Sequence, residues 1–82
     1  MRRGPSYDFP RLERLVTLLR YIHRHPYCGT EEVLQQCEIS EATFFRFKVA
    51  AQSLGVLIEW IEHREHSGYK IINYGLINPK KL

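Results

Sequence analysis

The sequence lacks the features that mark several protein classes. It has no apolar run near the ~20 residues that a membrane-spanning helix needs. No apolar segment follows the basic start MRRGPSYDFP, so this start is not that of a secretion signal. Two cysteines, Cys28 and Cys37, are too few for a disulfide framework. We therefore expect a protein of the reducing cytoplasm, with no membrane partner.

Signatures of catalysis and of metal binding are also scarce. The sequence has no glycine-rich phosphate loop, nucleophile elbow or paired-carboxylate signature, so we expect neither an enzyme nor a cofactor. His23, His25 and Cys28 lie close together in sequence, and His63 and His66 form a second pair. Thiol and imidazole groups would suit zinc, but the spacing matches no common structural zinc pattern. We expect no metal site and assign Cys37 to the core.

The residues that are present suit one small folded domain. The chain has 82 residues, of which 44% are hydrophobic, and it includes five tyrosines, four phenylalanines and one tryptophan. A chain this short buries roughly 60–65% of its unfolded surface, so its core must be well used. Twelve Lys and Arg residues against nine Asp and Glu residues give a formal charge of +3. That mild basicity permits a nucleic-acid partner without requiring one.

The first part of the sequence predicts an arm and then a helix. Residues 1–10 hold two prolines and a glycine and are expected to form a flexible arm. Apolar residues then recur at helical spacing and predict a single buried face, made of Leu12, Leu15, Val16, Leu19 and Ile22. Pro26 ends this helix.

Two shorter helices are predicted next. Thr30 is a suitable N-cap for the first, because acidic residues follow in its first turn, where the helix dipole favours them. Ser40 caps the second, which runs to about Leu54 and ends at Gly55, a C′ residue expected in the left-handed conformation. The buried face of this second helix is predicted to contain Phe44, Phe47, Ala51 and Leu54.

The rest of the sequence predicts a β-hairpin. VLIEWIE and YKIINY are rich in β-branched and aromatic residues, and the polar HREHSG lies between them. The predicted order is three helices followed by a two-stranded hairpin, which is an α+β fold. Residues 11–75 would form this domain, and 76–82 would be a tail or the start of a linker.

This order resembles a winged helix-turn-helix. ISEATFFRF, LGVLIEW and SGYKI are similar to the recognition helix and wing strands of the N-terminal domains of WYL-domain, deoxyribose-operon-type and biotin-repressor-type regulators. The likeness covers about residues 11–73. The chain departs from the pattern at Glu38, where glycine is usual, and at Lys48, where a buried isoleucine is usual. Phe47 is then expected to take over the core position one residue earlier.

The resemblance implies sequence-specific binding of double-stranded DNA by a prokaryotic or phage transcription regulator. Four residues at the start of the recognition helix would then face base edges in the major groove: Glu41, Ala42, Thr43 and Arg46. Phe45 would pack between the core and the DNA backbone, and Lys48 would add a positive charge. Arg46 and Glu41 could equally be ordinary surface charges.

Further contacts are expected from helix starts and from the hairpin tip. Thr30 and Ser40 lie where backbone N–H groups can bind phosphate, although capping alone explains both. The tip residues would reach a minor groove or flanking phosphates, unless they form a solvated turn. Those residues are His63, Arg64, Glu65, His66, Ser67 and Lys70, with Arg64 the best single candidate.

One electrostatic feature opposes DNA binding. Four carboxylates are predicted near the phosphate backbone: Glu31, Glu32, Glu38 and Glu41. Arg2, Arg3 and Arg11 would compensate, as would a homodimer formed through Leu18, Tyr21 and residues 74–76. A protein bound to DNA would be associated with the nucleoid. The alternative interpretation is a winged-helix module for protein–protein interaction that does not bind DNA.

Overall fold

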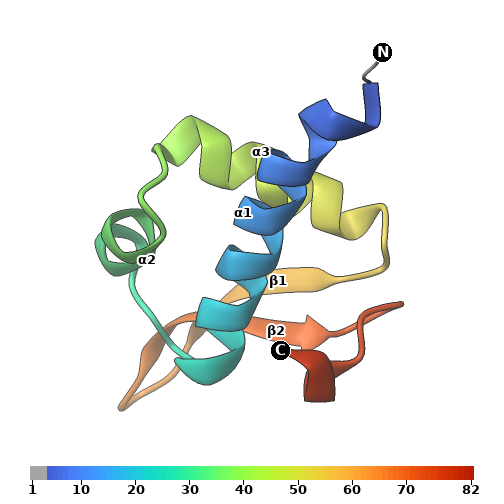
Figure 1. Ribbon diagram of the computed structural model, residues 1–82. Coiled ribbons are helices and arrows are strands. Elements are labelled where there is room, and N and C mark those ends of the chain that lie inside the picture. The colour runs from blue at the N-terminus through green and yellow to red at the C-terminus, as the bar shows by residue number, and fades with distance from the viewer. Residues whose placement is uncertain (1–3) are drawn as a thin grey trace.

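A computed structural model describes the backbone of residues 4–82 and the side chains of residues 12–82. Three helices precede a two-stranded antiparallel hairpin, so the predicted α+β class is confirmed, and the arrangement is compatible with a winged-helix layout (Figure 1). The elements are α1 (Gly4–Arg24), α2 (Thr30–Cys37), α3 (Glu41–Gln52), β1 (Leu57–Glu62), β2 (Ser67–Asn73) and the 3-10 helix η1 (Pro79–Lys81).

Helix α1 begins at Gly4, whereas residues 1–10 were predicted to form an arm. Pro5 is compatible with this start, because the first N–H groups of a helix have no acceptor within the helix. Pro10 removes one donor from the helix interior. The predicted charge compensation by Arg2, Arg3 and the side chain of Arg11 lies outside the described residues.

The buried face of α1 is rotated from the predicted stripe. Leu15, Leu19 and Ile22 are buried as expected, but Leu18 is fully buried with them. The prediction that Leu18 contributes to a dimer surface is therefore wrong. Leu12 is half exposed, although it was predicted to be in the core. The shift follows from the partners of α1, since α2 and β2 both pack on it and together cover a wider face than one stripe.

The turn between α2 and α3 is closed by backbone geometry and one side chain. Glu38 adopts left-handed φ and ψ of 56° and 49°, the conformation for which glycine is usual at this position. Ser40 caps α3 as predicted, and its Oγ accepts a hydrogen bond from the Thr43 N–H at 3.1 Å. Thr30 was predicted to cap α2, but Gly29 takes that position and Thr30 is the first helical residue. Glu32 supports this start, because its Oε1 accepts from the Gly29 N–H at 3.3 Å.

The hairpin is joined to the connection between α1 and α2. Ile58 pairs with Ile71 on the buried face of the hairpin. On the other edge of β2, Cys28 forms an antiparallel bridge with Tyr69. The Tyr69 N–H donates to the Cys28 carbonyl at 2.8 Å, and the Tyr27 N–H donates to the Tyr69 carbonyl at 2.8 Å. Gly68 permits this close approach, because it lies directly against the Tyr27 backbone.

Residues 76–82 were predicted to be a tail or linker, but they fold back onto the domain. The Leu76 N–H donates to the Leu54 carbonyl at 2.9 Å, and Leu82 is buried in the core after η1. Gly55, at a φ of 77°, ends the α3 segment in the left-handed conformation that was predicted. Gly75, at a φ of 54°, packs against it. Across residues 4–82, no helix combines the length and apolar character needed to cross a membrane.

Candidate nucleic-acid interface

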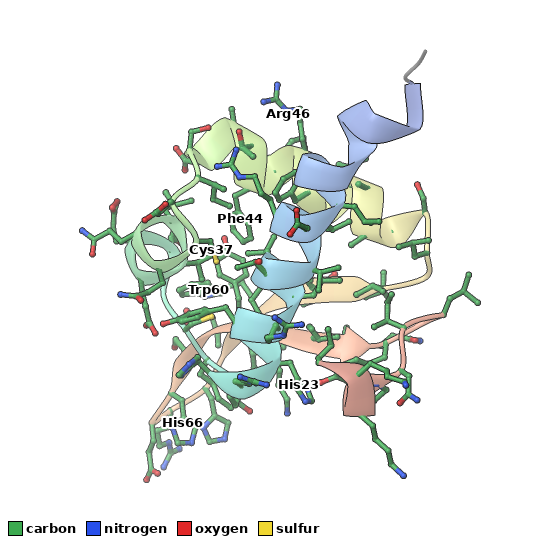
Figure 2. The ribbon with its side chains drawn as sticks, viewed as in Figure 1. His23, Cys37, Phe44, Arg46, Trp60 and His66 are labelled. Carbon is green, nitrogen blue, oxygen red and sulfur yellow. The ribbon has the colours of Figure 1, made fainter. Side chains whose placement is uncertain are left out.

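Helix α3 presents most of the predicted reading residues to solvent. Phe44, labelled in Figure 2, is buried in the core. Ala51 is also buried, and the two residues fix the rotation of the helix. Glu41, Ala42 and Arg46 are consequently exposed on the outer side. The N-terminal half of α3 therefore has its polar side chains available to a partner.

A chain of hydrogen bonds orders the start of α3. The Ser40 hydroxyl is 3.0 Å from the Thr43 hydroxyl, and the Arg46 guanidinium donates from Nη2 to Thr43 Oγ1 at 3.3 Å. Thr43 is half-buried, so it contributes more to the orientation of Arg46 than to a direct contact. Arg46 keeps its remaining donors for an external acceptor such as a guanine edge.

Lys48 is drawn toward aromatic rings rather than toward the outer face. Its Nζ lies 5.7 Å from the centre of the Phe44 ring and 5.3 Å from that of Tyr69. Both distances allow a cation–π attraction. Tyr69 also makes edge contacts with Phe44 at 4.9 Å and with Trp60 at 5.0 Å. The ammonium group is thereby held between α3 and β2, a position that the helical pattern alone did not indicate.

A pocket of about 150 Å³ brings four of the predicted site residues together. Thr30 lines it from the start of α2, and Glu41, Phe45 and Lys48 line it from α3. An ammonium group beside the first turn of a helix suits an anion, whereas the Glu41 carboxylate opposes one. The opposite charges of Lys48 and Glu41 therefore leave the pocket with little net preference for an anion.

The hairpin tip packs against the connection between α1 and α2. The rings of His66 and Tyr27 are in tilted contact with their centres 4.9 Å apart, and His66 stacks on His63 at 5.4 Å. Lys70 Nζ lies 5.5 Å from the centre of the Tyr27 ring. Arg64 is exposed at the tip. Figure 2 shows His66 and Arg46 at opposite ends of the molecule, so the tip and the start of α3 are two separate surfaces.

The predicted cluster of carboxylates is partly used within the protein. Glu31, Glu32, Glu38 and Glu41 are all exposed, as the electrostatic argument requires. Glu32, however, accepts hydrogen bonds from the Tyr21 hydroxyl and from the Gly29 N–H, and these lower the pKa of its carboxyl. This carboxylate therefore faces α1 rather than the outer side of α3. The same bond engages Tyr21, which was predicted to lie in a dimer surface.

Arg14 is a candidate contact residue that the sequence did not indicate. Its Nη2 donates to the Glu38 carbonyl at 2.8 Å, which carries the guanidinium from α1 to the turn before α3. Arg14 then lies beside Thr43 and Arg46, and all three line one surface hollow. Arg14 is not part of the predicted apolar face of α1, and the sequence pattern did not indicate that its side chain reaches the turn before α3.

The histidines and cysteines do not converge on a metal site. The structure shows no group of three or more His, Cys, Asp or Glu side chains arranged for a metal ion among the described residues. His23 Nδ1 lies 2.7 Å from the Tyr74 hydroxyl, which ties α1 to the segment after β2. Cys28 is buried, and burial raises the pKa of its thiol to about 11.

Comparisons with known proteins do not identify a family. No protein-family model matches the chain, and no curated protein or solved structure shows significant similarity to it. The function must therefore be inferred from the residues and the geometry.

Proposed function

We propose that this protein is a winged helix-turn-helix that binds double-stranded DNA sequence-specifically, as a prokaryotic or phage transcription regulator. Helix α3 is the recognition helix and the β1–β2 hairpin is the wing. The observation that carries the proposal is the exposed start of α3, where Arg46 is oriented by Thr43 after a Ser40 cap. Side chains at the start of the second helix of such a motif face base edges.

The backbone bridge on the outer edge of β2 supports the same proposal. The isolated Cys28–Tyr69 bridge joins the segment between α1 and α2 to β2, next to the wing. It fixes the position of the hairpin relative to the segment before α2. Arg14 at the turn before α3 and Lys48 between α3 and β2 add positive charge and compensate in part for the exposed carboxylates.

The test is a titration of isotopically labelled protein with a random-sequence duplex at low and moderate salt, followed by backbone amide shifts. We expect salt-sensitive shifts in residues 40–48 and 63–70, because phosphate contacts release counterions. The same titration is made with Arg46→Ala, which should reduce the shifts. Lys80→Ala is its matched control, because it also removes one exposed positive charge but lies in η1, away from α3 in sequence. An absence of shifts even at low salt would refute the proposal.

One observation favours the alternative of a protein-interaction module that does not bind DNA. Phe45 is 64% exposed and Val49 is 49% exposed, both on α3. Glu41 adds negative charge beside them. Neither apolar side chain gains from contact with phosphate. The titration separates the two functions, since the alternative predicts no salt-dependent shift on α3.

A further inference from the structure

A groove of about 570 Å³ separates the described part of α1 from α3. Its walls are largely apolar, with Leu12 and Leu15 on α1 and Phe47 and Ala50 on α3. Leu15 is buried in the core, but 51% of Leu12 is exposed. The groove therefore presents apolar surface to solvent, in the size range of sites that hold one ligand or one helix face.

Two arginines also line this groove. Arg14 is fixed by its bond to the Glu38 carbonyl at 2.8 Å, and Arg46 by its bond to Thr43 Oγ1 at 3.3 Å. Each guanidinium has five donors, so each keeps most of them free. No acidic side chain is among the described residues that line the groove. Its chemistry is thus an apolar surface accompanied by positive charge.

We propose that this groove binds an amphipathic helical segment of another protein, with acidic residues beside its apolar face. Leucine-sized anchors would cover Leu12 and Phe47, and carboxylates would pair with Arg14 and Arg46. Charge-assisted hydrogen bonds of this kind are among the stronger polar contacts in proteins. A DNA backbone offers carboxylate-like oxygens but no aliphatic group to cover the apolar wall.

Binding in the groove has a regulatory consequence. Arg46 and Thr43 belong both to the groove and to the proposed DNA-reading surface. An acidic helix and a duplex would therefore compete for the same guanidinium. The competition rests on the proposed DNA-binding function, whereas peptide binding itself does not.

The experiment uses two synthetic helical peptides of about 15 residues, which span ~22 Å. One carries leucines at i, i+3, i+4 and i+7 with flanking glutamates, and the other replaces the glutamates with lysines. Titrated into labelled protein, the acidic peptide should cause saturable amide shifts in residues 12–15 and 43–50. The lysine peptide should bind at least about tenfold more weakly, since close like charges repel.

Two leucine variants provide a matched comparison. Leu12→Ser should weaken binding of the acidic peptide by about tenfold, the effect expected when an apolar anchor is lost. Leu76→Ser should leave binding unchanged, because Leu76 is also exposed but does not line the groove. Arg14→Gln should weaken binding of the acidic peptide but not binding of the lysine peptide.

Several results would overturn the proposal. They are an absence of saturable binding, equal binding of both peptides, or equal effects of Leu12→Ser and Leu76→Ser. A concentration-dependent dimer that Leu12→Ser abolishes, seen by sedimentation, would assign the groove to a second copy of the chain. If the acidic peptide displaces a labelled duplex from the protein, the result supports competition between peptide and DNA for Arg46. Peptide binding without any DNA binding would retain the groove site and refute only the DNA-binding function.

Discussion

Gly68 lies directly against the backbone of Tyr27, and there is no space between them for a side chain. A Cβ on Gly68 would overlap the carbonyl carbon and oxygen of Tyr27 and would lie 2.7 Å from the Cys28 carbonyl oxygen. All three atoms belong to the backbone, so a rotamer change cannot relieve the overlap. The glycine is required by the bridge that joins the hairpin to the segment before α2.

Gly68→Ala should therefore destabilise the protein by about 1–3 kcal/mol, the usual cost of forcing an extra carbon into a packed site. Urea unfolding measures the change. Gly29→Ala is the control, because nothing lies within 4 Å of a Cβ at that position. Its effect should be small, since weaker N-capping and lower unfolded-state entropy act in opposite directions. Equal stability of Gly68→Ala and the wild type would contradict the packing described for the bridge.

Phe44 and Phe45 are neighbours with opposite environments. Phe44 is buried in the core, whereas Phe45 is exposed. Phe44→Ala should cost ~3–5 kcal/mol of stability, as truncation of a large core residue does. Phe45→Ala should change stability by less than about 0.5 kcal/mol, as most surface substitutions do. Thermal melts of the two variants test the rotation of α3, and similar melts would mean that its faces are wrongly assigned.

Arg46 and Lys48 should differ in what they contribute to DNA binding. Arg46→Ala should weaken binding to a preferred sequence by ~1–3 kcal/mol and relax specificity, as expected for a base contact. Lys48→Ala should weaken binding to all sequences alike and lower the salt slope by about one, as expected for a phosphate contact. Binding isotherms over a range of salt on specific and random duplexes separate these effects. An unchanged preference in Arg46→Ala would eliminate it as a reading residue.

The hydrogen bond between Tyr21 and Glu32 predicts that the protein loses stability both in acid and in alkali. This bond, then burial and the Glu32 charge, raise the pKa of Tyr21 to about 12. The same bond, then the Gly29 N–H, lowers the pKa of Glu32. Glu32 thus stabilises the fold above the ordinary carboxyl pKa, and this contribution is lost as pH falls through the lowered value. Tyr21 stabilises it below its ordinary pKa of 10, and this is lost as pH rises toward 12.

Tyr21→Phe should remove the Tyr21 contribution and the larger part of the Glu32 contribution, while the bond from the Gly29 N–H to Glu32 remains. The variant should be less stable than the wild type near neutral pH, and the difference should narrow in acid and in alkali. Urea unfolding at about pH 3, 7 and 11 measures the three regions. Parallel curves for variant and wild type at all three values would show that the bond does not contribute to stability.

Local patterns in the sequence predicted the elements and several of their ends. The order of helices and strands, the Ser40 cap and the left-handed Gly55 are all present. Each depends on residues within one or two helical turns, which is the range that periodicity and capping rules cover. Glu38 departs from the glycine of similar turns, yet it adopts the required conformation and its carbonyl is bound by Arg14.

Features that depend on tertiary packing were not predictable in the same way. Leu18 is buried because α2 and β2 widen the covered face of α1, and this requires knowing how those elements pack. Thr30 was taken as a cap because it is a good capping residue, but Gly29 precedes Glu32 by three positions and fits the local turn. The separation of Arg46 from the hairpin tip likewise depends on the orientation of the whole hairpin. The spacing of residues in the sequence does not determine this orientation.

The backbone bonds between Tyr27, Cys28 and Tyr69 have a consequence for how this molecule can be changed. The hairpin and the connection before α2 are held by main-chain atoms, so substitutions on the exposed face of α3 leave these bonds in place. Glu41, Ala42 and Arg46 are exposed, so they can be exchanged at little cost in stability. A library randomised at these three positions would therefore vary the exposed start of α3 while the framework stays the same. The domain is suited to the selection of new binding specificities.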